Sequence, residues 1–136
     1  MSRWTVSPIT DLPAVLDGER ADPMWYPLQH ALGIDTFGVN VFVARHADQV
    51  LVEEHDERGS GQQELYLVLD GSAAFELDGE TVQLDRGGAL AVTDPTVSRR
   101  AWALTAGTML LVVGAANGPF ESTWNAAHFA DIPRPG

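Results

Sequence analysis

From Phe37 onward, the chain alternates between short runs rich in Val, Leu, Phe and Tyr and turns built from Gly, Asp or Pro. The runs recur about every 8–12 residues, a spacing typical of all-β sandwiches and barrels. The sequence therefore predicts an all-β domain. The predicted strands are Phe37–Ala44, Val50–Glu54, Glu64–Leu69, Ser72–Leu77, Glu80–Leu84, Ala89–Thr93, Arg99–Leu104 and Thr108–Gly114.

The segments on either side of these runs have a different texture. Residues 1–36 carry several prolines and no sustained helical period, so we expect an irregular N-terminal arm that packs on the barrel formed by residues 37–114. Residues 115–136 form a tail in which a short helix is expected near residues 120–130, with Trp124, His128 and Phe129 lying on the barrel. The three parts are expected to form a single domain.

Composition excludes several classes of partner. Eight basic residues against nineteen acidic ones give a net charge of −11, which repels phosphate backbones and anionic lipid, so neither nucleic acid nor a membrane is expected as a partner. The chain has no cysteine, so any metal ion would have to be bound by His or carboxylate ligands. This composition and the N-terminal sequence favour a cytoplasmic protein.

The segment from Glu53 to Gly71 concentrates the candidate chemistry. Alternate side chains of a strand share a face, so His55 lies on the same face as Glu57, and Glu64 on the same face as Tyr66. By the same rule, Arg100 shares a face with Trp102. Packing these strands into one barrel can bring His55, Glu57, Glu64 and Arg100 towards a common centre.

These motifs resemble those of the cupin superfamily over roughly residues 37–114. His55-Asp56-Glu57 is similar to the H-x-H of the first cupin motif, and Glu64 and Gly71 match its later Glu and Gly. Counting back from Glu64 at the family's spacing places Glu57 and Gly59 in the H-x-H positions instead. This chain matches the second cupin motif at two positions and differs from it at three. Gly88 and Pro95 match, whereas Val97, Arg100 and Leu104 replace its Gly, His and Asn.

The resemblance implies a double-stranded β-helix, a jelly-roll barrel of two antiparallel sheets, often dimeric, with a pocket at one end. In complete members three His and one Glu hold iron, manganese, zinc or nickel. His55 and Glu64 carry over as ligand types here, and Glu57 is a carboxylate substitute. Arg100 has no lone pair to donate to a metal. We expect it either to pair with Glu64 or Glu57, or to hold the carboxylate of an anionic ligand.

Three functions follow as hypotheses. The favoured one is binding of a small, possibly anionic, molecule in the barrel pocket without strong metal dependence. The expected ligand contacts are Arg100, Glu64, His55, Tyr66 and Trp102. The alternative is an enzyme. It would be either a metal-assisted oxygenase or isomerase using His55, Glu57 and Glu64, or a metal-free isomerase with Glu64 or His55 as its base. The third is a non-catalytic homodimer that buries the Leu65, Leu67 and Leu69 face, because we expect this strand to be buried on both faces.

Overall fold

The computed structural model describes residues 3–15, 22–116 and 126–133. Its strands are β1 (Met24–Pro27), β2 (Gly38–Val43), β3 (Val50–His55), β4 (Gln63–Asp70), β5 (Ser72–Leu77), β6 (Glu80–Asp85), β7 (Ala89–Val92), β8 (Arg99–Ala103) and β9 (Met109–Ala115). The helical pieces are η1 (Ile9–Asp11), α1 (Leu28–Ala31) and η2 (Ala126–Phe129). Every predicted strand is therefore present, and β1 is an additional strand inside the N-terminal arm.

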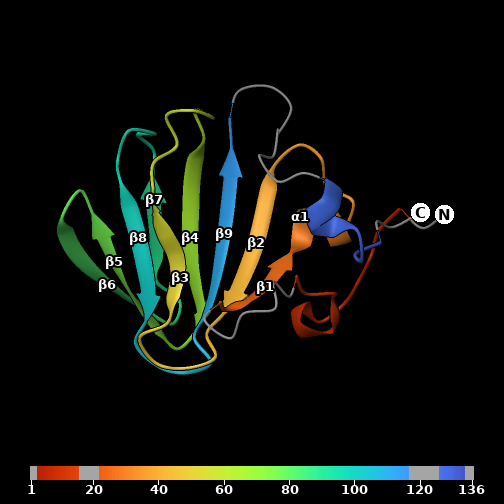
Figure 1. Cartoon of the computed structure of the whole chain (residues 1–136), viewed down its shortest axis with the longest axis horizontal. Helices are drawn as coiled ribbons and strands as arrows, with labels where there is room; N and C mark the ends of the chain where they lie inside the picture. Colours follow the sequence, from red (N-terminus) through yellow and green to blue (C-terminus); the bar gives the residue numbers. More distant parts are fainter. Residues whose placement is uncertain (1–2, 16–21, 117–125, 134–136) are drawn as a thin grey trace.

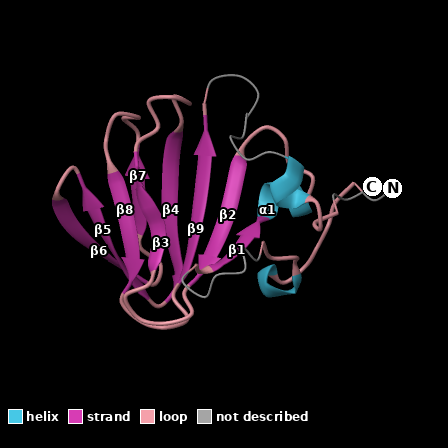
Figure 2. Ribbon diagram, viewed as in Figure 1, coloured by secondary structure: helices cyan, strands magenta, loops and turns pink. Residues whose placement is uncertain are grey.

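The strands form two antiparallel sheets. One has five strands in the order β1-β2-β9-β4-β7, and the other has four in the order β3-β8-β5-β6. Neighbours in each sheet are mostly distant in sequence, as in a jelly roll (Figure 1). The short helical pieces lie at the β1–β2 side of the molecule, away from β5 and β6 (Figure 2).

Two tight turns show why the strands end where they do. Asp78 and Gly79, between β5 and β6, have φ values of 49° and 86°, as the predicted hairpin turn requires. At Gly71, between β4 and β5, φ is 72° and an added Cβ would lie 2.4 Å from Thr108 Oγ1. Glycine is needed there for its conformation and for its lack of a side chain.

The main core lies between the two sheets. Its largest members include Tyr66, Phe75 and Leu110, which are completely buried. A second apolar cluster covers the outer face of β2 and β9, where residues of the arm and of α1 pack on Val39 and Val41.

The outer face of β4 departs from the prediction that this strand is buried on both faces. Leu65 and Leu69 are each 37% exposed in the single chain, because the arm covers β2 and β9 but does not extend over β4. The inner face of the strand, which carries Tyr66 and Val68, is fully packed.

The C-terminal segment packs on the β1–α1 side. Phe129 stacks on His30 with ring centroids 4.5 Å apart and meets Trp25 edge-on at 6.0 Å. The expected helix is a short 3₁₀ turn in the part described, and Trp124 lies outside the described residues. No helix among the described residues is long and apolar enough to cross a membrane.

Candidate functional site

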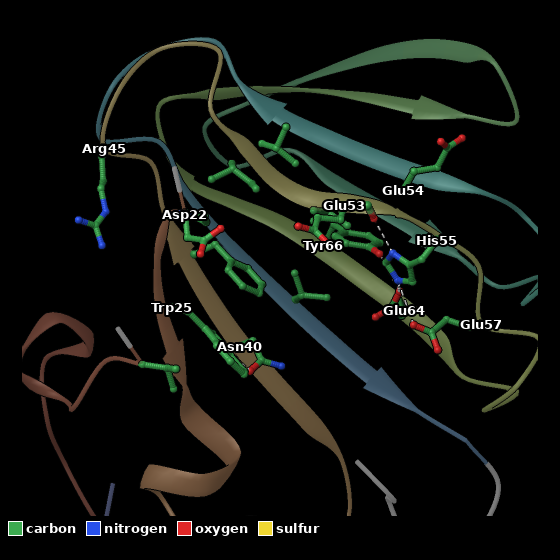
Figure 3. A pocket seen from close by; sticks show the side chains of 17 residues that line it. Asp22, Trp25, Asn40, Arg45, Glu53, Glu54, His55, Glu57, Glu64 and Tyr66 are labelled. Carbon is green, nitrogen blue, oxygen red and sulfur yellow. Dashed lines mark hydrogen bonds and ion pairs between the residues drawn. The ribbon is translucent and has the colours of Figure 1, made fainter. Parts of the chain in front are cut away.

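A cavity of about 580 Å³ opens between the edges of the two sheets, where β1 and β2 face β3 (Figure 3). Trp25, Asn40 and Phe42 line it from the five-stranded sheet, and His55 lines it from the four-stranded sheet. In Figure 3, His55, Glu57 and Glu64 gather at one end, while Arg45 and Asp22 lie towards the other.

The aromatic wall of the cavity is held in a fixed orientation. The indole of Trp25 stacks on Phe42 with ring centroids 6.4 Å apart and an interplanar angle of 18°. Its Nε1–H donates a 2.8 Å hydrogen bond to Asn40 Oδ1. Because that bond uses the amide oxygen, the amide nitrogen is the group of Asn40 that remains suited to a ligand acceptor.

His55 reaches the cavity because β3 is irregular. The register with β8 pairs Val52 with Ala101 and His55 with Arg99, with a shift between these pairs and another between Val50 and Val52. Val52 and His55 are three positions apart, so in a regular strand they would point to opposite faces. The extra residue in β3 instead places both of them opposite inward-facing residues of β8.

Three of the predicted site residues come together at one end of the cavity. His55 Nε2 lies 3.1 Å from Glu57 Oε1 and 3.6 Å from Glu64 Oε1. Its Nδ1 is bonded to the carbonyl oxygen of Glu53 at 2.7 Å. Glu57 is held in turn by Ser60, whose hydroxyl donates to Oε2 at 2.5 Å. The imidazole is thus clamped between a backbone carbonyl and two carboxylates.

Arg99 is the fixed positive charge of the site. Its side chain is completely buried, and Nη1 donates to Glu64 Oε1 at 2.8 Å. Nε and Nη2 both donate to the carbonyl of Val97, at 3.1 and 2.9 Å. The same Glu64 oxygen accepts a 2.7 Å hydrogen bond from the Tyr66 hydroxyl. Arg99 therefore connects the four-stranded sheet to the carboxylate on β4.

The prediction that Arg100 pairs with Glu64 or Glu57 is wrong. Strand alternation separates Arg99 from Arg100, and the Arg99 face is the one that packs inward with Ala101 and Ala103. Arg100 lies on the other face, with its guanidinium 5.1 Å from the centre of the Trp102 ring. Neither Arg100 nor Trp102 lines the described cavity. Ala101 and Ala103 share a face with Arg99, and these two small apolar residues were the sequence feature that could have identified the Arg99 face as the buried one.

The surroundings of these groups set their charge. Hydrogen bonds to Glu57 and then Glu64, only partly opposed by burial, raise the pKa of His55 to about 10. Burial would raise the pKa of Glu64, but hydrogen bonds from His55, Tyr66 and Arg99 outweigh it and lower the pKa. Burial, together with the charge of Glu64, raises the pKa of Tyr66. At neutral pH the cluster holds two carboxylates, an imidazolium and a guanidinium.

The cluster does not suit a resident divalent ion. One ligand atom from each of His55, Glu57 and Glu64 falls within 4.8 Å of the others, which is close enough to surround an ion. However, Glu64 Oε1 is already bonded to the Arg99 guanidinium and the Tyr66 hydroxyl. Arginine stays protonated and has no lone pair, so a fixed positive charge of the protein already occupies the carboxylate oxygen that an ion would need.

Comparison with known proteins identifies the fold. No protein-family model and no curated protein sequence matches the chain. Its structure is similar to that of a cupin protein from Bacteroides fragilis, with a TM-score of 0.65 and 18% identity over 91% of this chain and 93% of that chain. KdgF from Halomonas sp. gives a TM-score of 0.63 and 18% identity over 87% and 96% of the two chains.

A third similar structure is a sugar phosphate isomerase of the cupin superfamily from Silicibacter pomeroyi. It gives a TM-score of 0.59 and 19% identity over 82% of this chain and 73% of that chain. At these identities the similarity establishes the fold alone, and the chain has the cupin fold.

Stability measurements on Arg99→Met and Arg100→Met test the placement of the two arginines. Arg99→Met leaves Glu64 buried without its cation, so we expect it to lower the free energy of unfolding by about 3–5 kcal/mol. Arg100→Met removes a partly exposed contact with Trp102 and should cost about 1 kcal/mol or less. Chemical denaturation of both variants checks this, and equal losses would contradict the assignment.

The raised pKa of His55 predicts a loss of stability at alkaline pH. The folded pKa of about 10 lies above the ordinary value of 6.5. The stabilisation is therefore complete below about pH 6.5 and is lost as the pH rises through about 10. The difference in unfolding free energy between the wild type and His55→Gln should shrink across this window. A difference that stays constant with pH would show that His55 is not held as an imidazolium.

Proposed function

We propose that this cupin-fold chain binds a small neutral or cationic organic molecule in the cavity and does not depend on a divalent metal ion. The proposal depends on one observation: a single cavity of about 580 Å³ is lined by an aromatic surface and by a polar one. One is the aromatic wall of Trp25 and Phe42, and the other is the polar end with His55, Glu57 and Glu64. An apolar body with a few converging polar groups is the usual composition of a ligand pocket.

The charge of the lining argues against an anion. Among the described lining residues, the positive side chains are Arg45 and His55, and carboxylates outnumber them. The lining carboxylates are Asp22, Glu53, Glu54, Glu57 and Glu64. The net charge of −11 for the whole chain adds to this field. An anion is one option in the sequence-based expectation only because of Arg100, which does not line the described cavity.

The polar groups favour a ligand that carries hydroxyl or amino groups. Glu57 and Glu64 can accept hydrogen bonds, whereas the amide nitrogen of Asn40 can donate one. Asn40 lies on β2, Glu64 on β4 and Glu57 just after β3, and these positions would allow contacts at both ends of a molecule lying along Trp25 and Phe42. These groups support binding of a polyol, a sugar or a small amine.

A second candidate is a proton-transfer enzyme of the isomerase type. The observation that favours it is that an imidazolium and two carboxylates converge at one end of a cavity. His55 is the group that carries a proton to donate, although its raised pKa makes it a weak acid at neutral pH. A carboxylate of the cluster would be the group that accepts a proton. The sugar phosphate isomerase among the similar structures is consistent with this reaction class. The acidic lining, however, does not favour a phosphorylated substrate.

A third candidate is the non-catalytic homodimer. The exposed Leu65 and Leu69, with the half-buried Leu67 between them on the outer face of β4, support self-association, because pairing two such faces would remove them from water. We expect light scattering to give twice the chain mass for the wild type and the single chain mass for Leu67→Lys. A wild-type chain that is monomeric at high concentration would rule out the dimer.

The binding proposal is tested with ligands that share one shape and differ in charge. Choline, its uncharged analogue 3,3-dimethylbutan-1-ol and the anion 3,3-dimethylbutanoate form one such series, to be screened by thermal shift beside simple sugars and polyols. We expect cations or neutral molecules to raise the melting temperature and carboxylates to leave it unchanged. Hits found only among carboxylates would overturn the proposal.

Variants then locate the binding site of any hit. Phe42→Leu removes part of the aromatic wall and should weaken binding about tenfold, equivalent to about 1.4 kcal/mol. Trp102→Leu is the matched control, because that aromatic ring lies outside the cavity, and it should leave the affinity unchanged. Equal effects of the two substitutions would place the ligand elsewhere.

A further inference from the structure

We infer that the guanidinium of Arg99 stands in for a divalent metal ion, so that residue 99 decides whether this pocket binds metal. The inference deepens the metal-independent function proposed above and rests on it only for the location of the pocket. It does not depend on which organic ligand binds. It follows from the charges, distances and burial around Glu64.

A metal ion bound to Glu64 would lie close to the Arg99 guanidinium. Arg99 Nη1 lies 2.8 Å from Glu64 Oε1, and His55 Nε2 lies 3.6 Å from the same oxygen. An ion held by Glu64 Oε1 would be about 2.0–2.2 Å from that atom, and hence within about 5 Å of the Arg99 nitrogen. In a buried place, a divalent ion and a guanidinium at that distance repel each other strongly.

Arg99 can neither lose its charge nor move away when a metal ion approaches. An imidazolium can give up its proton when a metal binds, so His55 alone would not prevent coordination. Arginine stays protonated in proteins and has no lone pair to offer. The Arg99 side chain is also completely buried and anchored by two hydrogen bonds to Val97 O, so the charge is held in place.

A histidine at position 99 would have the right length to bind a metal ion at this place. Arg99 is the register partner of His55 across β3 and β8, so the two side chains start side by side. A histidine side chain is shorter than an arginine by about the length of one metal–nitrogen bond, about 2 Å. A histidine at position 99 would therefore place a metal ion about where the guanidinium now lies. His55, Glu57 and Glu64 would complete a set of four ligands.

Cobalt(II) titration of untagged protein tests the inference. Affinity is measured by calorimetry, and coordination is followed by the visible absorption of the ion. We expect Arg99→His to bind one Co²⁺ at least about tenfold more tightly than the wild type, a change of about 1.4 kcal/mol. Adding His55→Ala should abolish this gain. Arg100→His, which places the same new residue on the outer face, should behave as the wild type.

Several outcomes would overturn the inference. One is stoichiometric Co²⁺ binding by the wild type that equals that of Arg99→His and is lost in Glu64→Gln. Another is a folded Arg99→His protein that binds no more tightly than Arg100→His. If Arg99→His fails to fold, Arg99→Gln removes the charge without adding a ligand and should still bind Co²⁺ more tightly than the wild type. Equal affinities for these two proteins would also contradict the inference.

The result is separable from the proposed ligand binding. Suppose that the wild type binds neither Co²⁺ nor any small molecule, whereas Arg99→His gains Co²⁺ binding. This outcome would contradict the binding proposal and support the role of Arg99. A wild type that binds an organic ligand, and also binds Co²⁺ as tightly as Arg99→His, would support the binding proposal and contradict the role of Arg99.

Discussion

The ion pair between Arg99 and Glu64 is the contact on which the rest of the site depends. It joins β8 of one sheet to β4 of the other and lies behind the polar end of the cavity. Glu64 also accepts a hydrogen bond from the Tyr66 hydroxyl and lies beside His55. A single carboxylate therefore holds three side chains in place, those of Arg99, Tyr66 and His55. A buried charge requires such partners, and here two of the three, His55 and Tyr66, also line the cavity.

The cluster is close to electrically balanced within the protein. Glu57 and Glu64 face the imidazolium of His55 and the guanidinium of Arg99, so none of the four charges needs an external ion. Asp22, Glu53 and Glu54 add further negative charge to the lining.

Local patterns in the sequence were sufficient for the strands and for the convergence of His55, Glu57 and Glu64. They were not sufficient to decide which of two adjacent arginines points inward, because alternation defines two faces but long-range pairing selects the buried one. The extra residues in β3 are equally invisible in a single sequence. Trp25 was missed because β1 is a short strand that ends at a proline, inside a segment without periodicity. Asn40 lies on the predicted strand β2, but its bonding partner Trp25 was not foreseen.

The irregularity of β3 has a consequence for the mouth of the cavity. β1 and β3 are the end strands of their sheets, so each has an edge that no other strand of its sheet covers, although the Val15 N–H donates a hydrogen bond to the Trp25 carbonyl on the β1 edge. A straight edge of this kind can recruit a strand from another molecule and aggregate. The two register shifts in β3 and Pro27 in β1 interrupt both ladders. The same distortion that turns His55 inward therefore also protects the entrance from being sealed by a foreign chain.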